Sequence, residues 1–189
     1  MNDTIIIVGD SPFLERIEDK LQYALERYDS IGINNALLKY NMKLHIFQDE
    51  KFVKLTNRYP DVKTITLYMY GDLIKGDKEL YDSYAYNFKK NTEKDIIKDR
   101  KLAWCGFTHD YAISYCIIKG YTRIILAGAA DFTGGGHFAT EEDFNYSEKL
   151  KEMSKRFIEE VCAKRVEILT LNPHSFLNIP RIELPELLK

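Results

Sequence analysis

Short apolar runs alternate with segments of helical periodicity along most of the 189 residues, and this alternation constrains the fold most strongly. Residues 4–8 and 123–127 are apolar runs, whereas residues 106–119 carry apolar side chains at helical spacing. Strands that are joined through helices usually pair in parallel. The pattern therefore predicts an α/β fold with a mostly parallel sheet of about six strands.

Six segments are predicted to be strands, at residues 4–8, 30–33, 43–47, 63–69, 123–127 and 166–171. Helices are predicted after Ser11-Pro12, over residues 106–119 and over residues 146–163. Residues 71–100 carry many charges and no long apolar stripe, so we expect a surface excursion with some helix. The length and the overall composition predict a single domain over residues 1–189.

Composition excludes several classes of protein. Lys plus Arg total 27 against 29 Asp plus Glu, so the net charge of −2 does not favour nucleic acid as a partner. The longest uncharged apolar stretch has about eight residues, against the roughly 20 of a membrane span. The three cysteines include no Cys-x-x-Cys pair, which argues against disulfides and structural zinc. Together with the absence of a secretory signal pattern, this predicts a cytoplasmic protein. An oligomer is compatible with the sequence.

The loops after the predicted strands are the expected ligand sites, because open parallel sheets bind ligands beyond the carboxyl ends of their strands. Gly9-Asp10-Ser11-Pro12 lies at a helix start, a setting that binds phosphate through backbone N–H groups. Neither Gly-x-Gly-x-x-Gly nor a Gly-Lys-Ser/Thr loop is present. The alternative is purely structural: Gly9 makes the turn and Ser11 caps the helix.

Carboxylates at strand ends suggest a second kind of site. Asp10, Asp49 and Asp131 each follow a predicted strand, and three converging carboxylates could hold Mg²⁺. Asp10 could instead bind a ribose hydroxyl, since a carboxylate repels phosphate. Asp is also common at strand ends as a turn and cap residue.

The four histidines divide into one candidate base and three others. His137 follows three glycines in a loop that could fold over a ligand, so it is the candidate general base or phosphate contact. His45 lies within a predicted strand and is expected to be structural. For His109 and His174 the structural interpretation is also favoured. Neither a Gly-x-Ser-x-Gly elbow nor an acid–base pair for a cysteine supports a covalent nucleophile.

Several of these segments, in this order, resemble a family of enzymes. The series is IIIVGDSPFL, SIGINNALL, GFTHDYAISYCIIKGYTRIILAGAADF and VEILTLNPHSFL, and it resembles the bacterial sialyltransferases that use CMP-sialic acid. The loop LAGAADFTGGGHFAT is also similar to the related 6-hydroxymethylpterin diphosphokinases and motility-accessory glycosyltransferases. Both resemblances imply a Rossmann-like three-layer α/β/α domain that binds a nucleotide.

The sialyltransferase resemblance implies roles for individual residues. Those that would bind the nucleotide and its phosphate are Gly9, Asp10, Ser11, Pro12, Asn34, Thr108, Asn172, Pro173, His174 and Ser175. Two departures matter: Asp10 replaces the family's Asn, and the position of the family's catalytic His falls near Tyr146. His137, Tyr146 and Asp131 are therefore the candidate catalytic residues.

Three functions are compatible with these residues. The leading hypothesis is a sialyltransferase-like glycosyltransferase that moves a sugar from a CMP-sugar to the hydroxyl of a glycan or small molecule and needs no cofactor. The alternative is a Mg²⁺-dependent pyrophosphokinase acting on a pterin-like alcohol, with Asp10, Asp49 and Asp131 as metal ligands. The third is a nucleotide-binding module without catalysis.

The 13 tyrosines are unevenly placed along the chain. Tyr111 and Tyr115 share a face of a predicted helix, and Tyr68 lies in a predicted strand, so burial explains them. The tyrosines of residues 71–100 are instead expected to form a wall of the binding site.

Overall fold

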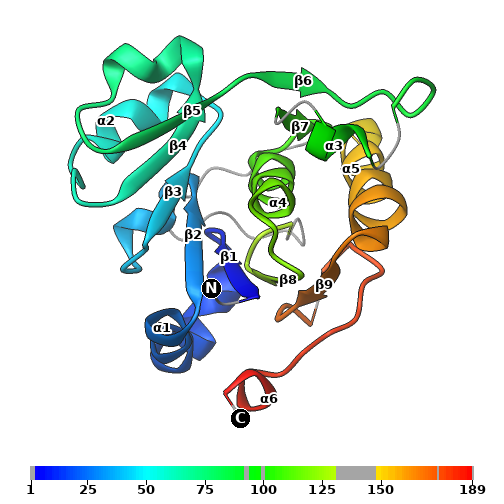
Figure 1. The fold of residues 1–189 in the computed structure, drawn as a ribbon. Helices are drawn as coiled ribbons and strands as arrows, with labels where there is room; N and C mark the ends of the chain where they lie inside the picture. The colour runs from blue at the N-terminus through cyan, green and yellow to red at the C-terminus, as the bar shows by residue number, and fades with distance from the viewer. Residues whose placement is uncertain (1–2, 92–93, 99–100, 131–147, 174, 189) are drawn as a thin grey trace.

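A sheet of seven parallel strands, in the order β5-β4-β3-β2-β1-β8-β9, forms the centre of the protein (Figure 1). The computed structural model describes residues 3–91, 94–98, 101–130, 148–173 and 175–188. The strands of the sheet are β1 (Thr4–Val8), β2 (Asp29–Ile33), β3 (Leu44–Ile46), β4 (Lys63–Leu67), β5 (Lys78–Tyr81), β8 (Arg123–Ala127) and β9 (Glu167–Thr170). The predicted α/β class is confirmed, with one strand more than the six expected.

Helices cover both faces of this sheet. The α-helices are α1 (Glu18–Arg27), α2 (Val53–Thr56), α3 (Asp95–Lys98), α4 (Thr108–Lys119), α5 (Glu148–Arg156) and α6 (Leu184–Leu187). Short 3₁₀ helices lie at η1 (Pro12–Ile17), η2 (Asn34–Leu38), η3 (Glu50–Phe52), η4 (Tyr68–Leu73) and η6 (Cys162–Lys164), and η5 (Phe157–Val161) is a π-helical turn. Figure 1 shows α4 and α1 on opposite sides of the sheet.

The side chains of β1 show how the layers are built. Ile5 and Ile7 belong to the core shared with α4, whereas Ile6 and Val8 belong to the core shared with α1 and α6. Successive residues of a strand point to opposite faces, so a run of apolar residues buries both faces. The unbroken apolar sequence at residues 4–8 therefore encodes a central strand that is covered on both sides.

The ends of two helices follow the sequence signals. Ser11 accepts a hydrogen bond on Oγ from the backbone N–H of Phe13, at 3.3 Å, and Pro12 begins η1, which leads into α1. Helix α4 ends at Gly120, whose φ of +85° suits a residue without a Cβ. The predicted N-cap and C-terminal glycine are both confirmed.

Residues 71–100 differ from the expected surface excursion. They contain β5, which adds an edge strand to the sheet, and β6 (Ser83–Ala85), which pairs in parallel with β7 (Leu102–Trp104). The ring of Tyr81 packs edge-on against the ring of Tyr115, with centroids 5.8 Å apart. The ring centroids of Tyr86 and Phe157 are 5.1 Å apart. Both tyrosines are buried in the core, so for these two the prediction of a binding-site wall is wrong; for Tyr84, which is half-buried on β6, it stays a prediction. Strand β5 was not predicted from the sequence, because an edge strand can carry charged side chains and so lacks a clear apolar pattern.

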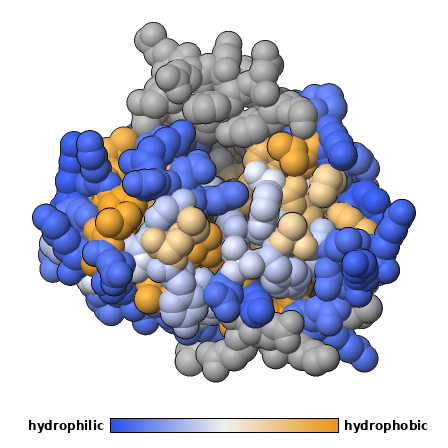
Figure 2. Space-filling model, turned by 90° about the horizontal axis from the view of Figure 1, so that it is seen from above, coloured by the Kyte–Doolittle hydropathy of each residue, from blue (hydrophilic) through white to orange (hydrophobic). Residues whose placement is uncertain are grey.

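Surface exposure corrects one further prediction. Tyr111 and Tyr115 are buried on α4 as expected, but the side chain of Tyr68 is 61% exposed, because the chain leaves the sheet at Leu67 and enters η4. Figure 2 shows hydrophobic residues in separate groups among hydrophilic ones on the face viewed from above. Within the described residues, no helix combines the length and apolar character needed to cross a bilayer.

Candidate functional site

The sheet reverses its order beside β1, and this defines the candidate site. From β1 the chain moves outward through β2, β3, β4 and β5, and then returns to place β8 on the other side of β1. Ligands of open parallel sheets bind beyond the carboxyl ends of the strands at such a reversal. The loops that follow Val8 and Ala127 are therefore the expected location.

The loops after β1 and β8 are in direct backbone contact. The N–H of Gly9 donates to the carbonyl of Ala127 at 2.8 Å, and a Cβ at Gly9 would overlap the Gly128 carbonyl oxygen. Gly128 has a φ of +64°, and a Cβ there would come within 2.8 Å of Leu14. Both positions therefore require glycine. The cap role of Ser11 is confirmed, whereas Gly9 is required by the close approach of Gly128. The phosphate role of both residues stays a prediction.

A polar corner joins the ends of β1 and β2. The carboxylate of Asp10 accepts a hydrogen bond from Asn35 Nδ2 at 3.1 Å, and only 7% of Asp10 is exposed. Asn34, the residue before Asn35, has a φ of +52°. Within the described part of the chain, the buried Oδ1 of Asn34 accepts no hydrogen bond. We call Asp10, Asn34 and Asn35 the β1–β2 corner. Its side-chain oxygens suit ligand hydroxyl or N–H groups better than phosphate.

His45 supports this corner from β3. Its Nε2 lies 2.9 Å from the carbonyl oxygen of Asn34, and its Nδ1 lies 3.0 Å from Thr56 Oγ1. A carbonyl only accepts, so Nε2 carries the proton and Nδ1 accepts from the Thr56 hydroxyl. Burial lowers the pKa of His45 to about 4, so the ring is neutral at pH 7. The structural interpretation of His45 is confirmed.

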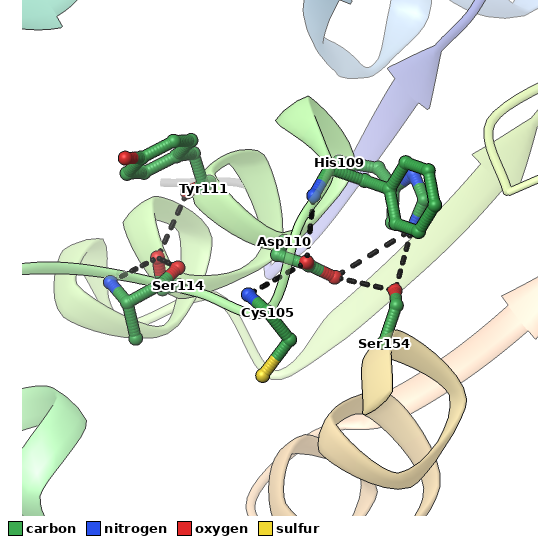
Figure 3. Close-up of polar contacts among 8 residues, drawn as sticks. Cys105, His109, Asp110, Tyr111, Ser114 and Ser154 are labelled. Carbon is green, nitrogen blue, oxygen red and sulfur yellow. Dashed lines mark hydrogen bonds and ion pairs between the residues drawn. The ribbon is translucent and has the colours of Figure 1, made fainter. Parts of the chain in front are cut away.

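The first turn of α4 carries Thr108, which is 7% exposed. Asp110 of the same turn belongs to a buried polar cluster (Figure 3). The Asp110 carboxylate accepts hydrogen bonds from the backbone N–H groups of Cys105, at 2.9 Å, and Phe107, at 3.1 Å. Ser154 of α5 donates to the same carboxylate at 2.7 Å and lies 2.9 Å from His109 Nε2. These bonds fix the start of α4 and tie it to α5.

This cluster contains Ser, His and Asp but lacks the geometry of a hydrolytic triad. In a triad the serine gives its proton to the histidine, and the aspartate holds the other ring nitrogen. Here Ser154 donates directly to Asp110, and the approach of 3.5 Å between His109 and Asp110 uses the same Nε2. Ser154 is fully buried, and burial lowers the pKa of His109. The cluster is structural, as expected for His109.

The loop after β9 lies on the same edge of the sheet, next to the loop after β8. Leu171 donates its N–H to the carbonyl of Leu126 at 2.9 Å, which keeps this loop beside β8. Asn172 is 2% exposed, and its N–H donates to Thr170 Oγ1 at 3.1 Å. Ser175 accepts a hydrogen bond on Oγ from the N–H of Leu177, and Pro173 is exposed. Any nucleotide contact of Asn172, Pro173 and Ser175 stays a prediction.

The described carboxylates do not form a metal cluster. Asp49 is exposed beyond β3. It lies near Tyr70, whose pKa is raised by burial and by the Asp49 and Glu50 carboxylates. No group of three metal-binding side chains occurs within the described residues. Asp131, His137, Tyr146 and His174 lie outside the residues that the structure describes, so their proposed roles and the full Mg²⁺ set stay predictions.

Three residues of this region were given no role from the sequence. Asn35 has a weak signal, because it follows Asn34 at the end of a strand. Asp110 stands three residues after Phe107 at the start of α4, the position from which an acidic side chain reaches back to the helix start. Ser154 has no local signal, because its partner is 44 residues away.

Comparison with known proteins gives one informative structural match. No family model matches the sequence, and no curated protein matches it either. The solved structure of the MAf glycosyltransferase from Magnetospirillum magneticum AMB-1 matches 98% of this chain with a TM-score of 0.66 and 12% sequence identity. The match establishes the fold. It confirms the Rossmann-like α/β architecture, and this chain spans 34% of the matched chain.

Proposed function

We propose that the protein is a glycosyltransferase that binds a nucleotide-sugar across the carboxyl ends of β1, β2, β8 and β9. The observation that carries the proposal is the β1–β2 corner, in which the buried Asp10 and the half-buried Asn34 and Asn35 lie beside the reversal of strand order. Buried polar side chains at a topological switch are typical of a ligand site. The structural similarity to a protein described as a glycosyltransferase is consistent with it.

The chemistry of the corner suggests how the nucleotide-sugar would lie. Asp10 and Asn34 present oxygen acceptors, so they would bind hydroxyls of the ribose or the sugar rather than phosphate. The phosphate would lie between the loop after β1, where Ser11 and Pro12 begin η1, and the Thr108 hydroxyl at the start of α4. Donors in that place would stabilise the charge that develops on the leaving phosphate, without a metal.

The finer parts of the proposal concern donor and acceptor. We propose a CMP-sugar as donor, with Asn172, Pro173, His174 and Ser175 around the base and ribose. His137 would take the proton from the acceptor hydroxyl as its oxygen bonds to the sugar carbon and the bond from that carbon to the phosphate oxygen breaks. Tyr146 and Asp131 would assist at the reacting centre. The acceptor would be a glycan or small molecule.

A thermal-shift screen of CMP, CDP, UDP, GDP and ATP tests the proposal. A nucleotide present at 100 times its Kd stabilises the fold by about 2.7 kcal/mol, which raises the Tm of a chain of this size by about 5–10 °C. We expect CMP to raise the Tm equally with Mg²⁺ and with EDTA. A shift that needs Mg²⁺ would favour the pyrophosphokinase instead, and no shift with any nucleotide at millimolar concentration would contradict the proposal.

A further inference from the structure

We propose that His45 is a positioning residue of the nucleotide site, although it lies below that site and does not line it. In this inference, which rests on the function proposed above, the ring of His45 holds the carbonyl of Asn34 and thereby fixes the β1–β2 corner. The structure supplies a continuous set of contacts from β3 through β2 to the loop after β1.

The first contact in this set is made by the ring itself. His45 is fully buried and is held at both nitrogens, by Thr56 Oγ1 at 3.0 Å and by the Asn34 carbonyl at 2.9 Å. Phe47 lies against it with ring centroids 5.7 Å apart. A side chain that is packed and bonded at both ends keeps one orientation, so its N–H is a fixed donor.

The second contact is with a backbone that needs support. Asn34 has a φ of +52°, a left-handed conformation in which Cβ crowds the following carbonyl and which is uncommon outside glycine, although asparagine adopts it more often than most residues. Such a conformation persists where the surroundings determine it. The bond from His45 Nε2 to the Asn34 carbonyl is a specific contact that does so at this residue.

The third contact carries the effect to the site. Asn34 is the first residue of η2, and the next residue, Asn35, donates from Nδ2 to the Asp10 carboxylate. The side-chain oxygen of Asn34 lies in the same corner, buried and without a hydrogen bond to any described residue. If the backbone of Asn34 relaxed, both Asn34 and Asn35 would move relative to Asp10.

A pair of nearly isosteric substitutions separates the hydrogen bond of His45 from its volume. His45→Gln keeps an N–H donor at the position of Nε2, whereas His45→Met fills similar space and has none. Thr66→Val is a matched control on the neighbouring strand, since the buried Thr66 hydroxyl makes no hydrogen bond within the described residues. All three proteins are titrated with CMP, and the ¹³Cα and ¹³Cβ shifts of Asn34 report its backbone conformation.

The inference predicts that His45→Met shifts the Asn34 signals away from the left-handed values and weakens CMP binding about tenfold, roughly the effect of one lost hydrogen bond in the site. His45→Gln should restore both readouts to within about threefold of wild type in affinity, and Thr66→Val should change neither. Unchanged Asn34 signals in His45→Met would overturn the inference, as would equal CMP affinity in the Met and Gln variants. Absence of CMP binding to the wild type would overturn the proposed function and with it the role of His45 in binding. The Asn34 signals would still show separately whether His45 holds the backbone of Asn34.

Discussion

The side chain of Asn35 donates to the carboxylate of Asp10 at 3.1 Å, across the ends of two neighbouring parallel strands. This contact places a nearly buried carboxylate beside the point where the strand order of the sheet reverses. An aspartate in that place with an amide donor is suited to bind hydroxyls. The geometry of the candidate site therefore depends on this corner and on the backbone that holds it.

Close contact between the loops after β1 and β8 makes Gly9 sensitive to substitution. In Gly9→Ala the new Cβ would overlap the Gly128 carbonyl, so the two loops must separate. We expect the free energy of unfolding, measured in urea, to fall by about 3 kcal/mol or more.

Gly120→Ala is the matched control for that substitution. Gly120 has a positive φ, but its Cβ position has no atom within 4 Å among the described residues. Backbone strain alone should cost about 1–2 kcal/mol there. If Gly9→Ala cost no more than Gly120→Ala, the tight contact between the two loops would be wrong.

The left-handed backbone of Asn34 separates its structural role from its role in binding. Asn34→Gly removes the carboxamide at a φ that suits glycine, so the free energy of unfolding should change by less than about 1 kcal/mol. Asn34→Ala should lower it by about 1–2 kcal/mol relative to Asn34→Gly. Both variants should bind CMP more weakly than the wild type. Urea unfolding and calorimetric titration measure the two effects, and wild-type affinity in Asn34→Gly would remove Asn34 from the site.

Buried histidines make the stability of the fold depend on pH. The pKa of His45 falls from 6.5 to about 4 on folding, so between these values the unfolded chain binds more protons and stability decreases as pH falls. The pKa shift of His45 lowers the free energy of unfolding by about 3 kcal/mol as pH falls from 7 to 4. The pKa of His109 is also lowered, which acts in the same direction.

Comparison with His45→Gln isolates the contribution of this histidine. Urea unfolding at a series of pH values should show a smaller loss of stability in the variant as pH falls from 6.5 to 4. Below that range the two curves should run parallel, because His45 is then protonated in both states of the wild type. Parallel curves over the whole range would show that His45 is not neutral in the folded protein.

The Asp110 cluster should affect folding and not covalent chemistry. Asp110→Ala leaves the N–H groups of Cys105 and Phe107 and the hydroxyl of Ser154 without their acceptor, so the free energy of unfolding should fall by about 3–5 kcal/mol. Asp110→Asn keeps an acceptor oxygen, so it should lower the free energy of unfolding less than Asp110→Ala does. A fluorophosphonate probe should not label Ser154, which is fully buried; labelling there, detected by mass spectrometry, would contradict the structural interpretation.

Much of the fold could be predicted from the sequence because its central strands are covered on both faces. Residues 5–8 and 124–127 are continuous apolar runs, and each forms the body of a strand that begins one residue earlier, β1 at Thr4 and β8 at Arg123. Strand β5 was missed because its partly exposed residues carry charges, as in Lys78-Glu79, and its burial depends on Tyr81 meeting Tyr115. That contact joins residues far apart in the sequence, which periodicity does not report.

The candidate site was predictable only where it follows strand ends. Asp10 and Asn34 could be singled out because parallel strands bring their carboxyl ends to one edge. The supporting role of His45 could not be predicted, because its two partners, Asn34 and Thr56, are each 11 residues away in the sequence. The positive φ of Asn34 likewise results from packing and is not encoded by the residue type alone.

Titration of CMP into ¹⁵N-labelled protein tests the central claim most directly. The account predicts saturable shifts at Gly9, Asp10, Asn34 and Asn35 and at Thr108, with β5, four strands from β1, as an internal reference that does not move. Asp10→Ala should abolish the shifts at Asn34 and Asn35 while the remaining spectrum keeps its folded dispersion. Absence of saturable shifts, or shifts confined to β5, would contradict a nucleotide site at the ends of β1 and β2.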